Sequence, residues 1–208
     1  SETDFAAKSD TFLDFLDNLG KFVLENSINT NKQQFLSLDY ENGTVQDYFN
    51  SMISKIGENL ILNDLIIKNK SNSNFSFYIH NSYRKNIGKI ISLLEYSTTE
   101  KNTEIESLSK NLCMHIAAMK PESIDIIDLD KELISKEEKI QKELILNSGK
   151  PSNIVDKILE GKMNKFYSEV TLLNQNFVID PDKTIKEAIN DFNSSNTFKL
   201  IDYSLTSL

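Results

Sequence analysis

The chain has 208 residues, of which 39% are hydrophobic and 26% are charged, enough to bury the core of one large domain or two small ones. Its formal net charge of −8 argues against a nucleic-acid backbone or an anionic membrane as the main partner. The single cysteine, Cys113, excludes an internal disulfide framework and favours a reducing compartment. No apolar run of the sequence approaches membrane-spanning length.

The first third of the chain predicts two helices followed by a strand. Apolar residues recur with helical spacing over 11–26 and again over 44–57, where Gly57 is well placed to end the second helix. The period then changes, and the run 60–68 (LILNDLIIK) is rich in Ile and Leu. A short apolar run of this kind predicts a strand.

A β-hairpin is expected next. After a turn at 71–74, the segment 75–80 (FSFYIH) alternates between apolar and polar residues, as a half-buried strand does. A polar turn separates it from a second predicted strand at 87–96 (IGKIISLLEY). Two neighbouring strands joined by a short loop indicate an antiparallel pair. His80 ends the first strand on the face opposite the apolar one.

The second half predicts mainly helices. The expected elements are a helix at 103–119 ended by Pro121, a short extended segment at 124–129, helices at 135–147 and 151–169, a short helix at 184–191 and a strand at 197–205. The break Gly149-Lys150-Pro151 between the middle two helices predicts an αα-hairpin. Its apolar seam is thin and its polar surface wide, so we expect it to project from the body.

The order of elements predicts an α+β fold, with antiparallel sheets covered by helices on one face. We divide the chain into two related subdomains, residues 1–72 and residues 73–208, with the helical hairpin inserted at about 132–170. The first half has no hairpin to match the one in the second half. This asymmetry predicts that strands of the first subdomain precede Ser1.

No enzyme motif is present in the sequence: there is no phosphate-binding Gly-rich loop, no His or Cys cluster at metal spacing and no nucleophile elbow. We therefore expect no catalytic residue, no metal and no cofactor. His115 lies beside an apolar helical stripe and is interpreted as a structural histidine that packs at the edge of the core. Its neighbour Cys113 has no basic residue to activate it, so we interpret it as a small core residue or a semi-exposed one rather than a reactive thiol. For His80, a hydrogen-bonded surface role and a contact role remain open.

Asp4 and Phe5 form an acid–aromatic pair at the edge of the chain. Spacing alone favours a hydrophobic staple, in which Phe5 packs on the helix that begins near Ser9. The alternative is an exposed anchor that enters a pocket of a partner, where burying a Phe side chain contributes ~1.5–3 kcal/mol.

Seven stretches in the same order as in one family make the chain resemble elongation factor Ts. They are ETDFA at 2–6 (E-T-D-F-V in the family), IGEN at 56–59, YIH at 78–80, MHIAAMKP at 114–121, the G-K-P…K-F run at 149–166, EVTL at 169–172 and the Q-x-F-V…K-T-I run at 175–185. Each stretch alone is weak, and their order across the whole chain makes the match specific.

The resemblance implies a guanine-nucleotide exchange factor for the GTPase elongation factor Tu, and not an enzyme. It implies that Asp4 and Phe5 intrude near the magnesium and phosphate site of the GTPase, and that Ile56 and His80 line the same contact. It also implies a core of two similar subdomains, an N-terminal ubiquitin-associated-like module upstream of Ser1, and a cytoplasmic or organellar location.

The competing hypothesis is a non-catalytic scaffold that forms a homodimer through the helical hairpin. The resemblance itself assigns the hairpin to dimerisation or to contact with the third domain of the GTPase. Two departures from the family pattern stand out. Ala6 replaces the usual Val, and the segment 81–86 is longer and more basic than the usual tight turn.

Overall fold

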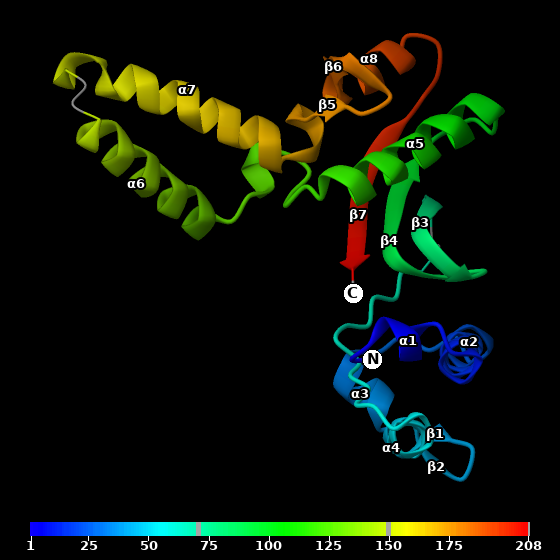
Figure 1. Cartoon of the computed structure of the whole chain (residues 1–208). Helices are drawn as coiled ribbons and strands as arrows, with labels where there is room; N and C mark the ends of the chain where they lie inside the picture. Colours follow the sequence, from blue (N-terminus) through cyan, green and yellow to red (C-terminus); the bar gives the residue numbers. More distant parts are fainter. Residues whose placement is uncertain (70–71, 149–150, 208) are drawn as a thin grey trace. The chain divides into compact units, whose positions relative to one another are not determined.

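The computed structural model describes residues 1–69, 72–148 and 151–207, and Figure 1 shows the path of the chain. The helices are α1 (Asp4–Ala7), α2 (Asp10–Glu25), α3 (Lys32–Leu36), α4 (Val45–Ile56), α5 (Thr103–Met119), α6 (Lys131–Asn147), α7 (Ser152–Val170) and α8 (Ile185–Phe192). The strands are β1 (Asp39–Tyr40), β2 (Gly43–Thr44), β3 (Asn74–Arg84), β4 (Ile87–Ser97), β5 (Asn176–Phe177), β6 (Asp180–Thr184) and β7 (Lys199–Ser207). Short 3₁₀ turns are η1 (Ile126–Asp128) and η2 (Leu172–Asn174). The α+β class is confirmed.

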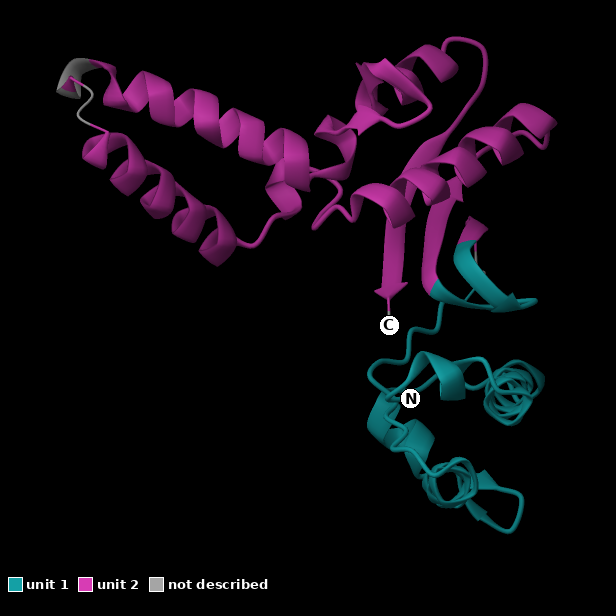
Figure 2. Cartoon of the chain, viewed as in Figure 1, with its two compact units in different colours: residues 1–71, 79–89, 208 teal, residues 72–78, 90–207 magenta. Residues whose placement is uncertain are grey.

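Two compact units divide the chain, as Figure 2 shows. Unit 1 contains residues 1–71 and 79–89, so it includes the tip of the β3–β4 hairpin as well as the first helices. Unit 2 contains residues 72–78 and 90–207. The predicted boundary between residues 72 and 73, and the similarity of the two subdomains, stay predictions.

Unit 1 is built on the helices α2 and α4. Their predicted ranges, 11–26 and 44–57, each agree with the structure to within one residue. The Ser9 side chain caps α2, and a capping box of Thr44 and Asp47 begins α4. Their apolar stripes meet in a core of aromatic and aliphatic side chains: Ala7, Phe12, Phe15, Leu19, Phe35, Val45, Phe49, Met52 and Leu60.

The strand predicted at 60–68 is wrong, because the structure has neither helix nor strand over residues 58–69. Leu60 is buried, and Leu62 and Leu65 pack partly against the core of unit 1. This segment therefore contributes apolar contacts in an irregular conformation. A run of Ile and Leu signals burial, but a strand also needs a neighbour to accept its hydrogen bonds.

The β3–β4 hairpin is longer than predicted. Strand β3 continues through Arg84 instead of ending at His80, and only Lys85 and Asn86 form the turn. Asn86 has a φ of 66°, in the left-handed region that Asn tolerates better than most residues. The polar segment that the sequence suggests as a long turn is therefore mostly strand. The turn predicted at 71–74 lies partly outside the described residues.

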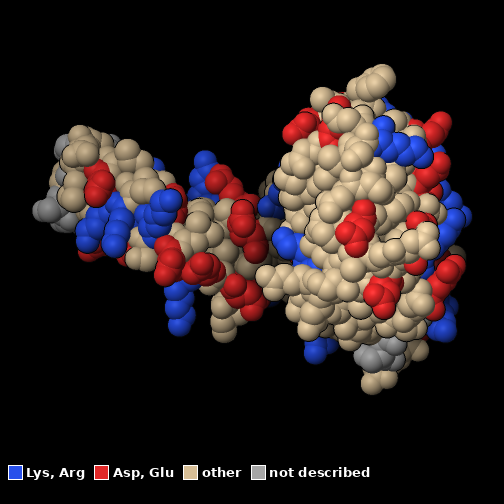
Figure 3. All heavy atoms as spheres, turned by 90° about the horizontal axis from the view of Figure 1, so that it is seen from below, with Lys and Arg blue, Asp and Glu red and all other residues tan. Residues whose placement is uncertain are grey.

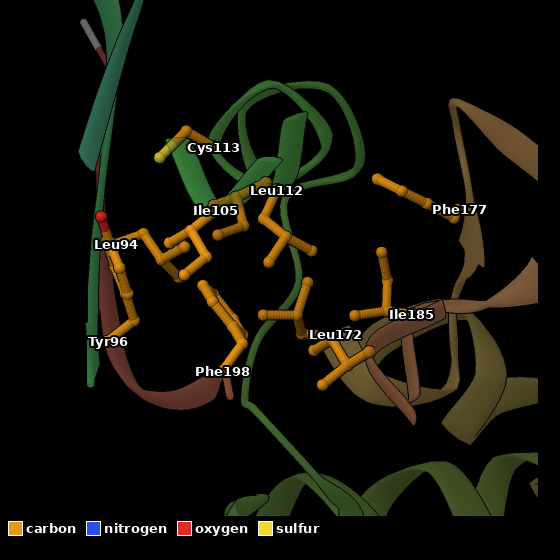
Figure 4. Packing of buried hydrophobic residues seen from close by; sticks show 11 residues of the cluster. Leu94, Tyr96, Ile105, Leu112, Cys113, Leu172, Phe177, Ile185 and Phe198 are labelled. Atoms are coloured by element: carbon orange, nitrogen blue, oxygen red, sulfur yellow. The ribbon is translucent and has the colours of Figure 1, made fainter. Parts of the chain in front are cut away.

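One three-stranded sheet has the order β3-β4-β7, and β4 and β7 run antiparallel in it. Residues 79–89 at the hairpin tip belong to unit 1, and the rest of the sheet belongs to unit 2. Helix α5, predicted at 103–119, has those bounds in the structure, and Pro121 follows its C-cap, Lys120. Figure 4 shows side chains of β4, α5 and the region around α8 pointing toward one another. This core comprises Leu94, Tyr96, Ile105, Leu112, Cys113, Ile116, Leu172, Phe177, Ile185, Ile189 and Phe198.

Helices α6 and α7 pack side by side around a small core of their own, away from the sheet of unit 2 (Figure 1). Ile145, Val155, Leu159 and Met163 form its buried part. Helix α6 starts four residues before its predicted start because Asp130 caps it at Glu132. The predicted break includes residues 149–150, which lie outside the described residues.

Two smaller predictions differ from the structure. The segment predicted as extended at 124–129 contains the 3₁₀ turn η1, which begins with a capping box of Asp125 and Asp128. The last strand, predicted at 197–205, is β7 at Lys199–Ser207. Among the described residues, no helix is both long and apolar enough to cross a membrane.

Candidate partner-binding site

Helix α1 displays an aromatic ring to solvent. Thr3 begins the helix by accepting a hydrogen bond from the Ala6 amide at 3.2 Å. Ala6 and Ala7 face inward and are buried, so the opposite side of this single turn faces outward. Phe5 lies on that side and is 88% exposed. The staple interpretation of Phe5 is therefore wrong, and the ring is available to a partner.

A pair of hydrogen bonds joins the start of α1 to the end of α4. The Thr3 amide donates to Glu58 Oε2 at 3.0 Å, and the Thr3 hydroxyl donates to Glu58 Oε1 at 2.5 Å. Gly57 makes this possible because its φ of 80° turns the chain sharply at the end of α4. Ile56 is the last residue of α4 and packs partly against the core of unit 1. The two motifs that contain Asp4-Phe5 and Ile56 are thus directly connected.

An ion pair joins α1 to the β3–β4 hairpin. Lys89 Nζ lies 3.6 Å from a carboxylate oxygen of Asp4, and both side chains are partly exposed. Exposed pairs of this kind add little stability, so this contact records that the two elements lie close together and is not a main source of their stability.

His80 lies on β3 in the same hairpin and is exposed. The opposite strand comes unusually close there: a Cβ atom on Gly88 would lie 2.3 Å from Ile79 Cγ2 and 3.1 Å from the His80 carbonyl oxygen. Only glycine fits such an approach. Gly88 therefore allows β4 to approach β3 closely beside His80, next to Lys89, the residue that contacts Asp4.

All four residues predicted to bind the partner, Asp4, Phe5, Ile56 and His80, lie in unit 1. They come from α1, the end of α4 and the hairpin tip. The contacts between these elements involve Thr3, Glu58 and Lys89. Thr3 and Glu58 lie within two positions of a predicted residue, whereas Lys89 lies nine positions after His80 on the other strand of the hairpin. Their role in binding a partner stays a prediction.

Three residues that organise this region were not predicted from the sequence: Glu58, Lys89 and Arg84. Glu58 lies within the IGEN stretch, yet spacing alone gives no partner for its carboxylate. A signal for Arg84 is present in the sequence: Asp10, Asp14 and Asp17 recur at helical spacing and form an acidic stripe that needs a cation.

Among residues 1–69, 72–148 and 151–207 there is no cluster of His, Cys, Asp or Glu that could hold a metal ion. His115, predicted to pack at the edge of the core, is completely buried, and burial lowers its pKa despite its hydrogen bond to Gln175. Burial also raises the pKa of the Cys113 thiol to about 11, so this thiol is unreactive at neutral pH.

Charged side chains of both signs lie on the face of the molecule that Figure 3 shows. On the face shown in Figure 3, Lys and Arg side chains are interspersed with Asp and Glu side chains, including those along α6 and α7. A surface with charges of both signs is better suited to specific contacts with another protein than to binding a polyanion.

The fold and this site define an α+β protein that exposes an aromatic ring beside polar groups on the surface of unit 1. The family model of elongation factor Ts matches residues 2–207, and the chain belongs to this family of translation elongation factors. Elongation factor Ts of Ehrlichia canis is 37% identical over 209 residues, covering 99% of this chain and 72% of that protein. Elongation factor Ts of Rickettsia prowazekii is 37% identical over 191 residues, covering 91% of this chain and 61% of that protein.

Proposed function

We propose that this chain is a guanine-nucleotide exchange factor that promotes GDP release from the GTPase elongation factor Tu. It acts by binding, with no bond made or broken, in the cytoplasm or an organellar matrix. The observation that supports this most is the 88% exposed ring of Phe5 on a capped, anchored helical turn. Family membership supplies the partner.

The proposed mechanism is a wedge. Phe5 enters the GTPase near its magnesium and phosphate site and displaces the elements that hold the metal. Asp4 fixes the wedge through hydrogen bonds, and Ile56 and His80 contact the neighbouring surface. A factor that binds the nucleotide-free GTPase more tightly than its GDP form must weaken GDP binding by the same ratio.

Burial of Phe5 alone does not provide the free energy that the proposed acceleration of GDP release requires. Accelerating GDP release ~10⁴-fold lowers the barrier by about 5.5 kcal/mol. Burying one Phe side chain provides ~1.5–3 kcal/mol. A broad interface, to which the hairpin of α6 and α7 contributes in this proposal, provides the rest.

Release of a fluorescent GDP analogue from elongation factor Tu tests the proposal. Phe5→Ala is expected to slow factor-stimulated release by at least tenfold. Leu24→Ala is the matched control, because Leu24 is also in unit 1 and is 80% exposed. An unchanged rate with Phe5→Ala would sink the wedge role, and no stimulation by the wild-type chain would sink the exchange function itself.

The homodimeric scaffold is the alternative. Leu144 and Leu146 on α6 are 54% and 55% exposed, which leaves apolar surface for a second copy. This hypothesis predicts that the wild-type chain sediments as a dimer and that Leu144→Glu dissociates it. It also predicts that neither the wild-type chain nor this variant affects GDP release. The two functions are thus separated by the same release assay.

A further inference from the structure

Arg84 binds three carboxylates of one helix. At the tip of the β3–β4 hairpin, its guanidinium lies 3.0 Å from Asp10, 2.5 Å from Asp14 and 3.2 Å from Asp17, all on α2. Only 30% of the Arg84 side chain is exposed. All four residues belong to unit 1.

We call this cluster the Arg84 clamp. The spacing of the three Asp residues and the shape of the guanidinium explain why it forms. The three Asp residues are spaced by four and three positions, so they share one face of α2. Side by side they repel one another unless a cation lies between them. Arginine suits the place because its planar fork donates to several carboxylate oxygens at once, which an ammonium group does less well. These carboxylates also raise the pKa of Arg84 above its ordinary value, first through the hydrogen bond to Asp14.

Two further contacts attach the same hairpin tip to the helices. Tyr83 packs partly against the core of unit 1, and Lys8 Nζ lies 5.7 Å from the centre of its ring. On the other strand of the hairpin, β4, Lys89 forms an ion pair with Asp4 of α1. The tip is therefore held at the helix side by Arg84, Tyr83 and Lys89.

The clamp connects the elements that bear the proposed contact residues. His80 lies four residues before Arg84 on β3, and Phe5 lies in the short helix directly before α2. An exposed hairpin with a two-residue turn has few restraints of its own at its tip. The clamp supplies these restraints, and it fixes where His80 lies relative to Phe5.

We propose that Arg84 is a positioning residue for nucleotide exchange: it holds the hairpin tip on α2 so that His80 and Phe5 meet the GTPase together. The inference rests on the proposed function. Arg84 itself is occupied by its three carboxylates and does not contact the GTPase. Its loss therefore lets the hairpin tip, and His80 with it, move relative to Phe5, and this weakens the cooperation between the two contact residues.

Arg84→Gln and Lys85→Gln form the matched pair for the first experiment. Both remove one positive charge from the same hairpin tip, and Lys85 is an exposed turn residue. Arg84→Gln is expected to lower the maximal rate of GDP release, at saturating factor, about fivefold. Lys85→Gln is expected to leave it unchanged. Equal rates for wild type and Arg84→Gln would overturn the inference, as would equal losses in both variants.

A double-mutant cycle distinguishes positioning from a general loss of stability. In the wild-type background, Phe5→Ala and His80→Ala are expected to be non-additive in their effect on the release rate, because the two side chains act together. In the Arg84→Gln background their effects are expected to become additive. Non-additivity that persists without Arg84 contradicts the positioning role.

Charge exchange covers the case in which Arg84→Gln folds poorly. Arg84→Glu combined with Asp14→Arg restores one pair across the same contact and is expected to recover part of the release rate lost by Arg84→Glu alone. No recovery in a folded double variant counts against the inference. If the wild-type chain does not stimulate release, the proposed function fails first; if it does and the Arg84 variants match it, only the positioning role fails.

Discussion

The cores of the two units are stabilised in different ways. All the buried polar residues among the described parts of the chain lie in unit 2: Ser73, Ser92, Ser109, His115, Ser123, Thr171 and Gln175. The core of unit 1 is made of apolar and aromatic side chains, and its ionic contacts, such as the Arg84 clamp, are at the surface. Buried hydrogen bonds specify one geometry, whereas apolar packing tolerates adjustment more readily.

A network around His115 illustrates the arrangement in unit 2. The Val178 amide donates to Nδ1 of His115 at 3.3 Å, so the proton of the neutral ring is on Nε2. Nε2 then donates to Oε1 of Gln175 at 2.9 Å, and the Gln175 amide donates to the Glu169 carbonyl at 2.7 Å. This chain of bonds joins α5, the end of α7 and the β5–β6 turn.

The comparison suggests why the proposed partner surface lies in unit 1. In unit 1 the elements that bear Asp4, Phe5 and His80 are held to one another by surface contacts, the Arg84 clamp and the pair of Lys89 with Asp4. The buried bonds of unit 2 instead suit a rigid support. Four changes test this difference, in order of decreasing effect.

Phe15→Ala is expected to have the largest effect, because it opens a cavity in the apolar core of unit 1. Phe15 is 1% exposed, and its ring centre lies 4.8 Å from that of Phe49 and 5.1 Å from that of Tyr48. A loss of ~3–5 kcal/mol in the free energy of unfolding is expected in urea titrations. A loss below about 1 kcal/mol would mean that this core is not what stabilises unit 1.

Gln175→Leu breaks the network around His115 in unit 2 while keeping a side chain of similar volume. It leaves the His115 ring proton and the Glu169 carbonyl without their bonds, and we expect a loss of ~2–4 kcal/mol. Gln46→Leu is the control, since Gln46 is exposed on α4 and bonds only to Asn50. Equal stability of the two variants would contradict a distinct role for buried polar groups in unit 2.

Acidification is expected to weaken unit 2 in particular. The folded-state pKa of His115 is lowered by burial, so the neutral ring's contribution is complete above its unfolded value of about 6.5 and is lost as the pH falls below it. The slope is at most about 1.4 kcal/mol per pH unit for one proton. Hydrogen exchange between pH 5 and 7 measures this: α5 should lose protection before α2. A flat profile that His115→Asn does not alter would refute the assignment.

Phe5→Ala is expected to have the smallest effect on stability, although it has a large proposed effect on function. An 88% exposed ring makes few contacts within its own unit, so the free energy of unfolding should change by less than about 0.5 kcal/mol. Thermal unfolding of Phe5→Ala beside Phe15→Ala makes the test. Destabilisation beyond 1 kcal/mol would show that Phe5 packs on unit 1 after all.

Many of the helices could be predicted from sequence periodicity, because the apolar stripe of a helix marks the face that it buries. The range of α5 could be predicted to the residue since its apolar stripe, its Asn102 cap and Pro121 agree. Strands are harder, because their hydrogen bonds depend on partners elsewhere in the chain. The run 60–68 has strand-like composition without strand structure, and β3 extends through polar residues that pattern alone assigns to a turn.

The candidate site shows the same limit. Phe5 could be singled out as an isolated aromatic residue, but its exposure depends on Ala6 and Ala7 facing inward, which needs the folded helix. The contacts Thr3–Glu58 and Arg84–Asp14 join residues 55 and 70 positions apart. A local sequence pattern cannot predict contacts between residues so far apart in the chain, although the acidic stripe on α2 indicates that a cation is needed.

The buried thiol of Cys113 makes the chain convenient for site-specific spectroscopy. It is the only cysteine in the sequence, it is inaccessible, and its raised pKa keeps it protonated at neutral pH. A cysteine introduced at an exposed position, such as Lys85, should therefore react with a maleimide dye while Cys113 stays unlabelled. One label at the hairpin tip then allows docking of the partner to be followed in real time on the native background, without first removing a natural cysteine.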